Sequence, residues 1–133
     1  VYVADTLGEL GLFYNLAPIA LVAGSLLPHL KGHNPIEPAK LGAAILTGPH
    51  VESFQDLFDA LFAAGGATSV DTPSSIAAAV TLLWRDDASR AEQLEAARRV
   101  AAQGADAFTH TLSSLAALLP PQPRAPRTAH ASA

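Results

Sequence analysis

The residues best suited to chemistry lie together in residues 32–39, whose sequence is GHNPIEPA. Asn34 can cap a helix, Pro35 suits the first helical position, and Glu37 stands where a capping-box carboxylate would reach back. In this frame Pro38 occupies the fourth helical position, where it removes the first intrahelical hydrogen bond. A local rule that is broken at one place indicates a functional site.

The neighbouring loop residues could bind a nucleotide. Gly24 and Gly32 allow a ligand to approach the backbone, and Ser25 can donate a hydroxyl group. Glu37 can accept two hydroxyl donors, which a ribose diol would provide. Helix N-termini at such loops bind phosphate or carboxylate groups without basic side chains. The alternatives are that the Gly-Ser pair is only a turn and that Glu37 is only a helix cap.

Three histidines, His29, His33 and His50, border the same loops and raise the possibility of a metal site, because imidazole is a common zinc ligand. Pro28 and Gly32 make the segment around His29 and His33 a loop, so the two side chains would not share one helix face. We therefore favour a contact between His33 and a phosphate or sugar, and we expect no metal and no cofactor.

The composition indicates one globular domain, with 133 residues of which 50% are hydrophobic and 15% charged. A net charge of −4 with only 8 Lys and Arg argues against nucleic-acid binding. The absence of Cys excludes disulfides and thiolate ligands. Pro18, Gly24 and Pro28 interrupt the most apolar region, so we expect no membrane-spanning helix and no signal peptide. The chain has no Met and opens at Val1 inside an apolar run, which suggests a fragment of a longer polypeptide.

The hydrophobic pattern alternates short apolar runs with amphipathic segments, which is typical of a parallel α/β sheet built from right-handed crossovers. Ligands bind such sheets outside the carboxyl ends of the strands. The loops expected at that edge are 5–6, 24–37 and 48–50. A capping box formed by Thr6 and Glu9 is expected to start the first helix. The expected strands are 1–4, 19–23, 43–47 and 67–70, and the expected helices are 7–17, 34–41, 51–64, 73–84 and 86–119, the last with a break or kink at Gly104.

Four segments of this sequence, at residues 4–14 (ADTLGELGLFY), 24–26 (GSL), 32–39 (GHNPIEPA) and 48–50 (GPH), together resemble the C-terminal half of the 3-deoxy-D-manno-octulosonic acid (Kdo) transferases. The resemblance extends over residues 1–84. It implies a Rossmann-like C-terminal domain of a GT-B glycosyltransferase, to which we assign residues 1–119. Residues 120–133 are rich in Pro, Ala and Arg and lack apolar periodicity, which predicts a disordered or extended tail. The resemblance also implies CMP-Kdo as the donor, a lipid A precursor as the acceptor, and an inverting transfer that uses no metal.

The resemblance further implies roles for individual residues. Glu37 would hold the ribose hydroxyls, while Ser25, His33 and Asn34 would lie near the phosphate or the Kdo group. The catalytic base of the family is a Glu of the N-terminal domain, which this chain does not contain, so no catalytic residue is expected and the chain alone should bind donor without completing transfer. The donor-binding residues expected in this way are Thr6, Gly8, Gly24, Ser25, Gly32, His33, Asn34 and Glu37.

The sequence departs from the family pattern at three places, one of which is Ser53, where the family commonly has an Asn after the Gly-Pro-His segment. The family usually has Gly-Gly-Ser at 23–25 and Gly-Gly-His at 31–33, where this chain has Ala23 and Lys31.

The resemblance places the parent enzyme at the cytoplasmic face of the bacterial inner membrane. Membrane association and most acceptor contacts would be made by parts of the enzyme that are not present here. The alternative function is a non-catalytic α/β domain that binds a nucleotide, an anion or a protein partner.

Overall fold

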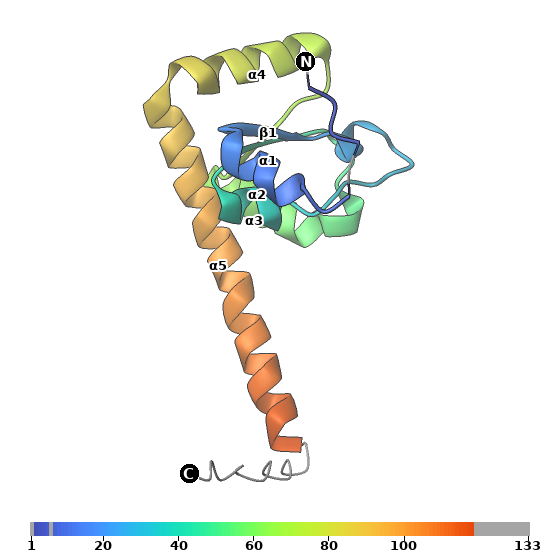
Figure 1. Ribbon diagram of the computed structural model, residues 1–133, viewed down its shortest axis with the longest axis vertical. Helices are drawn as coiled ribbons and strands as arrows, with labels where there is room; N and C mark the ends of the chain where they lie inside the picture. The colour runs from blue at the N-terminus through green and yellow to red at the C-terminus, as the bar shows by residue number, and fades with distance from the viewer. Residues whose placement is uncertain (1, 6, 119–133) are drawn as a thin grey trace, which may run out of the picture.

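The computed structural model describes residues 2–5 and 7–118, with the side chains of 104–109 and 117 excepted. Its centre is a parallel sheet of three strands, β1 (Ile19–Val22), β2 (Ala44–Thr47) and β3 (Ala67–Ser69), in that spatial order (Figure 1). Ile19 pairs with Ala44, and Ile45 pairs with Ala67. The parallel α/β class that the sequence predicts is therefore confirmed, and the carboxyl ends of all three strands share one edge.

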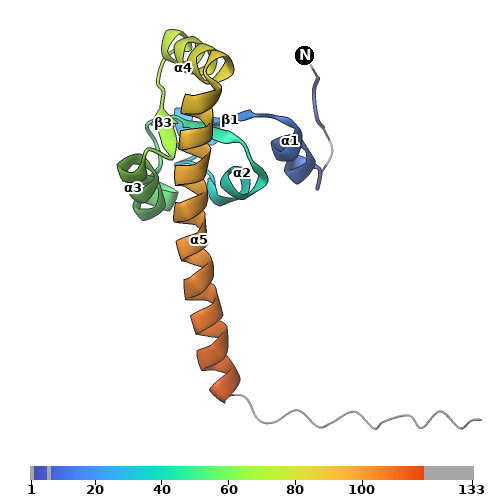
Figure 2. The same ribbon diagram turned by 90° about the vertical axis from the view of Figure 1, so that its left-hand side faces the viewer.

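Helices cover both faces of the sheet. One face packs against α2 (Ile36–Leu41), α3 (Gln55–Ala64) and the long α5 (Asp87–Leu118), and Figure 2 shows α2 and α3 on either side of α5. The other face packs against α4 (Pro73–Arg85). The core on the α5 side contains Val22, Ala39, Ile45, Val51, Phe58, Leu61, Ala97, Val100 and Ala101.

The central strand β2 is buried along its whole length. Ile45 packs toward α3 and α5, whereas Ala44 and Leu46 pack toward α4, so successive side chains serve opposite faces. Burial of one such Leu or Ile side chain stabilises the fold by about 1.5–3 kcal/mol. The uninterrupted apolar run at 43–47 is explained by this two-sided burial.

Several helix boundaries are those that the sequence predicts. At the start of α4 the Thr72 hydroxyl accepts from the Ser75 N–H at 3.2 Å, and the Ser75 hydroxyl accepts from the Thr72 N–H at 3.0 Å. Gly42 ends α2 and Gly65 ends α3, both with positive φ, at 100° and 73°. Glycine is favoured at these positions because it has no Cβ to clash in the left-handed region.

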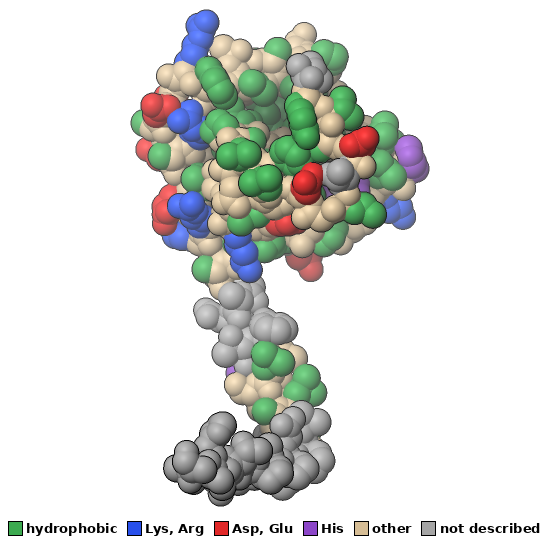
Figure 3. Space-filling model, in the orientation of Figure 1, with side chains coloured by type: hydrophobic (Ala, Val, Ile, Leu, Met, Phe, Trp, Pro, Cys, Tyr) green, Lys and Arg blue, Asp and Glu red, His purple; other side chains and the backbone are tan. Residues whose placement is uncertain are grey.

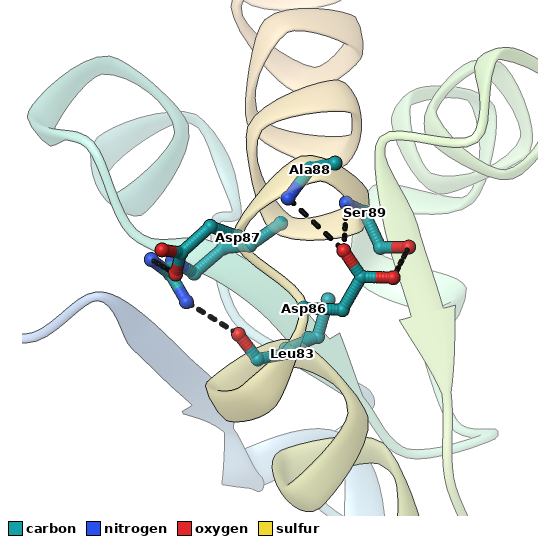
Figure 4. Close-up of polar contacts among 6 residues, drawn as sticks. Leu83, Asp86, Asp87, Ala88 and Ser89 are labelled. Carbon is teal, nitrogen blue, oxygen red and sulfur yellow. Dashed lines mark hydrogen bonds and ion pairs between the residues drawn. The ribbon is translucent and has the colours of Figure 1, made fainter.

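The long helix α5 begins at a cap formed by the Asp86 side chain. The Asp86 carboxylate accepts from the N–H groups of Ala88 and Ser89, both at 3.0 Å, and from the Ser89 hydroxyl at 2.7 Å (Figure 4). These hydrogen bonds, foremost that of the Ser89 N–H, lower the pKa of Asp86. Arg90 fixes the corner between α4 and α5, since it donates to the Leu83 carbonyl at 2.6 Å and pairs with Asp87 at 2.5 Å.

Several predicted elements and boundaries are wrong. Helix α5 runs through Gly104 without a break, because one glycine costs a helix only about 1 kcal/mol and its Ala-rich neighbours favour the helix. Residues 2–5 are exposed and form no strand, since β-prone residues need a neighbouring strand to pair with. Helix α1 (Leu10–Leu16) starts three residues later than predicted, with Glu9 itself at the cap position. Residue 6 and the proposed tail at 120–133 lie outside the described residues.

Two short 3-10 turns are present in the part of the chain that the structure describes. The turn η1 (Ala23–Leu26) follows β1 directly, and η2 (Glu52–Phe54) precedes α3, so the predicted helix 51–64 is divided in two.

Several apolar side chains of α1 and α4 stay exposed, and Figure 3 shows hydrophobic side chains on the face that carries these helices in Figure 1. A surface of this kind is typical of contacts with another protein or domain. The exposed apolar side chains of α1 and α4 are Leu10, Leu12, Leu16, Val80, Leu82 and Trp84.

Candidate functional site

The start of α2 is shifted by one residue from its predicted frame. The Asn34 side-chain oxygen accepts from the Ile36 N–H at 2.9 Å, and the first backbone hydrogen bond of the helix runs from the Ala39 N–H to the Pro35 carbonyl at 3.3 Å. Pro38 is therefore the third helical residue, where an N–H would have no partner within the helix. The predicted loss of a hydrogen bond at Pro38 is wrong, and Glu37, at the second position, is one residue short of a capping box.

This frame leaves Glu37 beside α1. A Cβ placed on Gly11 would stand 3.6 Å from a Glu37 carboxylate oxygen, so the absence of a side chain at Gly11 lets the carboxylate lie close to the helix. Glu37 is exposed and makes no hydrogen bond or ion pair with the part of the chain that the structure describes. Its acceptor oxygens are thus available to a ligand.

A cleft of about 310 Å³ lies between α1, the carboxyl end of β1 and the loop before α2. Its polar side chains come from α1, from that loop and from the first turn of α2, and its apolar wall comes from α1 and β1. This mixture of an apolar wall with a few convergent polar groups is typical of a small-molecule site. The lining residues are Leu10, Tyr14, Leu21, Val22, Ala23, His33, Asn34 and Glu37.

Tyr14 is the polar lining residue that the sequence motifs did not identify. In the sequence Tyr14 follows the helical spacing of the apolar residues in the predicted helix 7–17. Its phenolic hydroxyl is the one feature that separates it from those residues. In the structure the side chain is half-buried, and burial, followed by the negative charge of Glu37, raises the pKa of Tyr14 above its ordinary value. The hydroxyl therefore stays protonated near neutral pH and can donate a hydrogen bond into the cleft.

Ser25 serves the loops through a hydroxyl that is fully buried. The hydroxyl donates to the Val22 carbonyl at 2.5 Å and accepts from the Thr47 hydroxyl at 2.8 Å and from the Gly48 N–H at 2.5 Å. The Ser25 carbonyl also accepts from the His50 N–H at 2.9 Å. Ser25 joins the end of β1 to the end of β2, and its single hydroxyl proton is already used within the protein.

The glycines of the site allow close approach of protein groups to one another. A Cβ on Gly24 would overlap the imidazole of His33, so His33 lies directly over the turn that follows β1. Gly32 is buried with φ at 88°, and a Cβ there would be 3.0 Å from the His50 carbonyl. Lys31 also has a positive φ, at 54°, where the family pattern has a glycine.

The structure brings His33, Asn34 and Glu37 together at the cleft, and Gly24 lies against the His33 imidazole. Gly32 and Ser25 are buried and do not line the cleft. Gly8, with φ at 92°, is exposed in the loop before α1 and does not line the cleft. Thr6 lies outside the described residues. The binding roles of these residues stay predictions.

The histidines do not converge on a metal geometry within the described residues. The His50 Nδ1 lies 3.6 Å from a Glu52 carboxylate oxygen, and His29 is exposed in a turn. No group of three or more His, Cys, Asp or Glu side chains that could hold a metal ion is present in residues 2–5 and 7–118.

A larger hollow, of about 710 Å³, lies between the end of α3, β3 and the start of α5. It contains none of the predicted site residues. Its lining includes Gln93, whose amide donates to the Ile45 carbonyl and the Thr68 hydroxyl, both at 3.0 Å, and so ties α5 to the sheet. Gly65 in its lining precedes β3, which places it toward the amino end of that strand, whereas ligands bind parallel sheets at the carboxyl ends. We therefore assign the site to the smaller cleft.

None of the described helices combines the length and the apolar character needed to span a bilayer. The long α5 is polar along much of its surface, with charged residues in its first turns.

A parallel sheet with helices on both faces and a polar cleft at the end of β1 defines an α/β domain of the Rossmann-like type, as found in the C-terminal half of GT-B glycosyltransferases. The structure matches the crystal structure of the C-terminal CMP-Kdo binding domain of WaaA from Acinetobacter baumannii, with a TM-score of 0.72 and 27% identity, over 75% of this chain and 52% of that one. No family model matches the sequence.

The sequence is also similar to those of curated 3-deoxy-D-manno-octulosonic acid transferases. The chain is 45% identical over 85 residues to an Arabidopsis thaliana protein named "Probable 3-deoxy-D-manno-octulosonic acid transferase, mitochondrial", covering 62% of this chain and 19% of that protein. It is 37% identical to the 3-deoxy-D-manno-octulosonic acid transferases of Haemophilus influenzae, over 68% of this chain, and of Bordetella pertussis, over 86%. The chain spans 19%, 21% and 27% of the length of these three relatives. It is thus homologous to the C-terminal region of Kdo transferases, as the sequence motifs predict.

Proposed function

We propose that this chain is the donor-binding part of an inverting glycosyltransferase that transfers Kdo from CMP-Kdo to a lipid A precursor in lipopolysaccharide biosynthesis. The observation that carries the proposal is the cleft at the end of β1, where His33 and Glu37 present polar groups that make no hydrogen bond or ion pair within the described chain. The homologous solved domain, from Acinetobacter baumannii, is one that binds CMP-Kdo. Its match over 75% of this chain supports the same ligand here.

In the proposed complex Glu37 accepts hydrogen bonds from the two ribose hydroxyls of CMP. Its carboxylate oxygens offer about four acceptor positions, and none is used by the described residues. Hydrogen bonds to a charged group contribute about 1.5–3 kcal/mol each, so this contact would be a main source of affinity.

His33 and Asn34 lie on the same cleft and would contact the phosphate or the carboxylate of Kdo. The Asn34 oxygen already accepts from the Ile36 N–H, which leaves its amide N–H donors for the ligand. Gly24 and Gly32 keep the neighbouring backbone close, Ser25 holds the loop from beneath, and we keep Thr6 and Gly8 as the proposed adjacent wall.

The cleft supplies binding and orientation, and a general base for the acceptor hydroxyl would come from an N-terminal domain outside this chain. We propose residues 1–119 as the donor domain and 120–133 as a separate tail. The working place of the whole enzyme would be the cytoplasmic face of the bacterial inner membrane, with the lipid A precursor and the membrane contacted through other parts of the protein.

Calorimetric titration of the 133-residue chain with CMP, UMP and inorganic phosphate tests the proposal. We expect saturable binding of CMP and at least tenfold weaker binding of UMP and of phosphate. Glu37→Ala should weaken CMP binding by about tenfold or more, because it removes charge-assisted hydrogen bonds. Glu92→Ala, which removes a carboxylate from the larger hollow, is the matched control and should bind CMP as the parent chain does.

The proposal has two separate points of failure. An absence of CMP binding, or equal binding of CMP and UMP, would contradict the CMP-Kdo assignment. Full CMP affinity in Glu37→Ala would contradict the ribose role alone.

A further inference from the structure

Tyr14 is a polar lining residue of the cleft to which neither the motifs nor the resemblance gives a role. It projects from α1, which packs beside α2, and it lines the same cleft as Glu37. The Tyr14 hydroxyl makes no hydrogen bond with the part of the chain that the structure describes. A half-buried hydroxyl without a protein partner loses free energy unless water or a ligand satisfies it, so this group is suited to ligand recognition.

Tyr14 and Glu37 differ in what they can do for a ligand. The Glu37 carboxylate only accepts hydrogen bonds, whereas a phenol both donates and accepts. The partial burial of the ring, followed by the Glu37 charge, favours the neutral phenol, so the donor is retained. A ligand hydroxyl that donates to Glu37 still has lone pairs that can accept from Tyr14.

The apolar wall formed by Leu10, Leu21 and Val22 adds a second property. It displaces water from one side of the cleft, and a hydrogen bond in such surroundings discriminates strongly against a ligand that lacks the hydroxyl, because the protein groups are then left unpaired.

From this arrangement we propose that Tyr14 is a specificity-determining residue that recognises a ribose hydroxyl jointly with Glu37, and that it makes the cleft selective for ribonucleotides over 2′-deoxyribonucleotides. The inference rests on the proposed function, since it assumes that the ribose of the donor lies beside Glu37.

Calorimetric titration with CMP, 2′-deoxy-CMP, UMP and 2′-deoxy-UMP tests the inference on the parent chain and on two variants. Tyr14→Phe removes only the hydroxyl and keeps the ring. Tyr2→Phe makes the same change at the other tyrosine of the chain, which is 80% exposed and lies outside the cleft. Circular dichroism establishes that each variant is folded before titration.

We expect the parent chain to bind CMP about tenfold more tightly than 2′-deoxy-CMP. Tyr14→Phe should weaken CMP binding by about three- to tenfold and leave 2′-deoxy-CMP binding unchanged, so that the preference for ribose shrinks. Tyr2→Phe should change neither affinity.

The outcomes separate this inference from the proposed function. If the chain binds CMP tightly and Tyr14→Phe does not change that affinity, the role of Tyr14 is overturned and the proposed function stands. The same holds if Tyr14→Phe weakens the binding of CMP and of 2′-deoxy-CMP equally. Equal affinity of the parent chain for CMP and 2′-deoxy-CMP overturns the role of Tyr14 without any variant. Equal binding of CMP and UMP with a ribose preference that depends on Tyr14 supports the inference and overturns the CMP assignment. No binding of any of the four nucleotides overturns both.

Discussion

The hydroxyl of Ser25 connects two strand ends, and Ser25→Ala should therefore destabilise the fold strongly for so small a change. Removal of this oxygen takes the acceptor from the Gly48 N–H and from the Thr47 hydroxyl, and the donor from the Val22 carbonyl. The Thr47 hydroxyl can turn to the Gly48 carbonyl, which is 3.4 Å away. The Gly48 N–H loses its hydrogen-bond partner at a buried position.

One buried polar group without a partner costs about 1–3 kcal/mol, and a further lost hydrogen bond costs about 0.5–1.5 kcal/mol. We therefore expect Ser25→Ala to lower the free energy of unfolding by about 2–4 kcal/mol, a large part of the stability of an ordinary domain. Urea denaturation followed by circular dichroism measures this difference, with the slope against urea unchanged if only the native state is affected.

Ser74→Ala is the matched control, because Ser74 is exposed in the first turn of α4 and should change the free energy of unfolding by less than about 0.5 kcal/mol. A loss of less than about 0.5 kcal/mol in Ser25→Ala would show that these three hydrogen bonds do not hold the loops, and would refute the reasoning.

Three further predictions concern the same loops and the α5 cap. Gly48→Ala should destabilise the chain by about 2 kcal/mol or more, because its Cβ would overlap the backbone carbonyl of Ser25, and a normal urea midpoint would contradict this. Lys31→Gly should unfold with a free energy about 0.5–1 kcal/mol higher than Lys31→Ala, since only glycine relieves the left-handed φ, and equal midpoints would contradict the strain. The folded pKa of Asp86 is depressed, so its stabilising effect is present above its ordinary pKa of 3.8 and is lost as the pH falls through the folded value. Asp86→Asn keeps a capping oxygen but does not titrate. In acid the free energy of unfolding of the parent chain should therefore fall relative to that of Asp86→Asn. Parallel pH profiles of the two free energies would contradict this.

Much of the fold follows from local sequence. The apolar runs at 19–23 and 43–47 become β1 and β2, and the Thr72-Pro73 pair starts α4, because these signals depend only on residues close together in the chain. The same locality explains the errors at residues 2–5 and at Gly104, where an apolar run has no partner strand and a helix continues through its glycine.

The candidate site was predictable in part. The motif at 32–39 identifies the loop that meets the end of β1, but the frame of α2 differs by one residue, because Asn34 bonds to the Ile36 N–H while Pro35 accepts the first helical hydrogen bond. The hydrogen bonds of Ser25 join it to Thr47 and Gly48, which lie 22 and 23 positions later in the sequence. No local sequence pattern encodes such a pairing. Tyr14 enters the cleft only through the packing of α1 on α2.

The most direct test of the central claim is the location of CMP on the chain. Titration of the ¹⁵N-labelled chain with CMP, followed by two-dimensional nuclear magnetic resonance, should shift the amide signals of Gly24, His33 and Glu37 in a saturable way, and Glu37→Ala should weaken the response. Shifts confined to residues around Gly65 and Gln93, or no saturable shifts at all, would contradict a donor site at the end of β1.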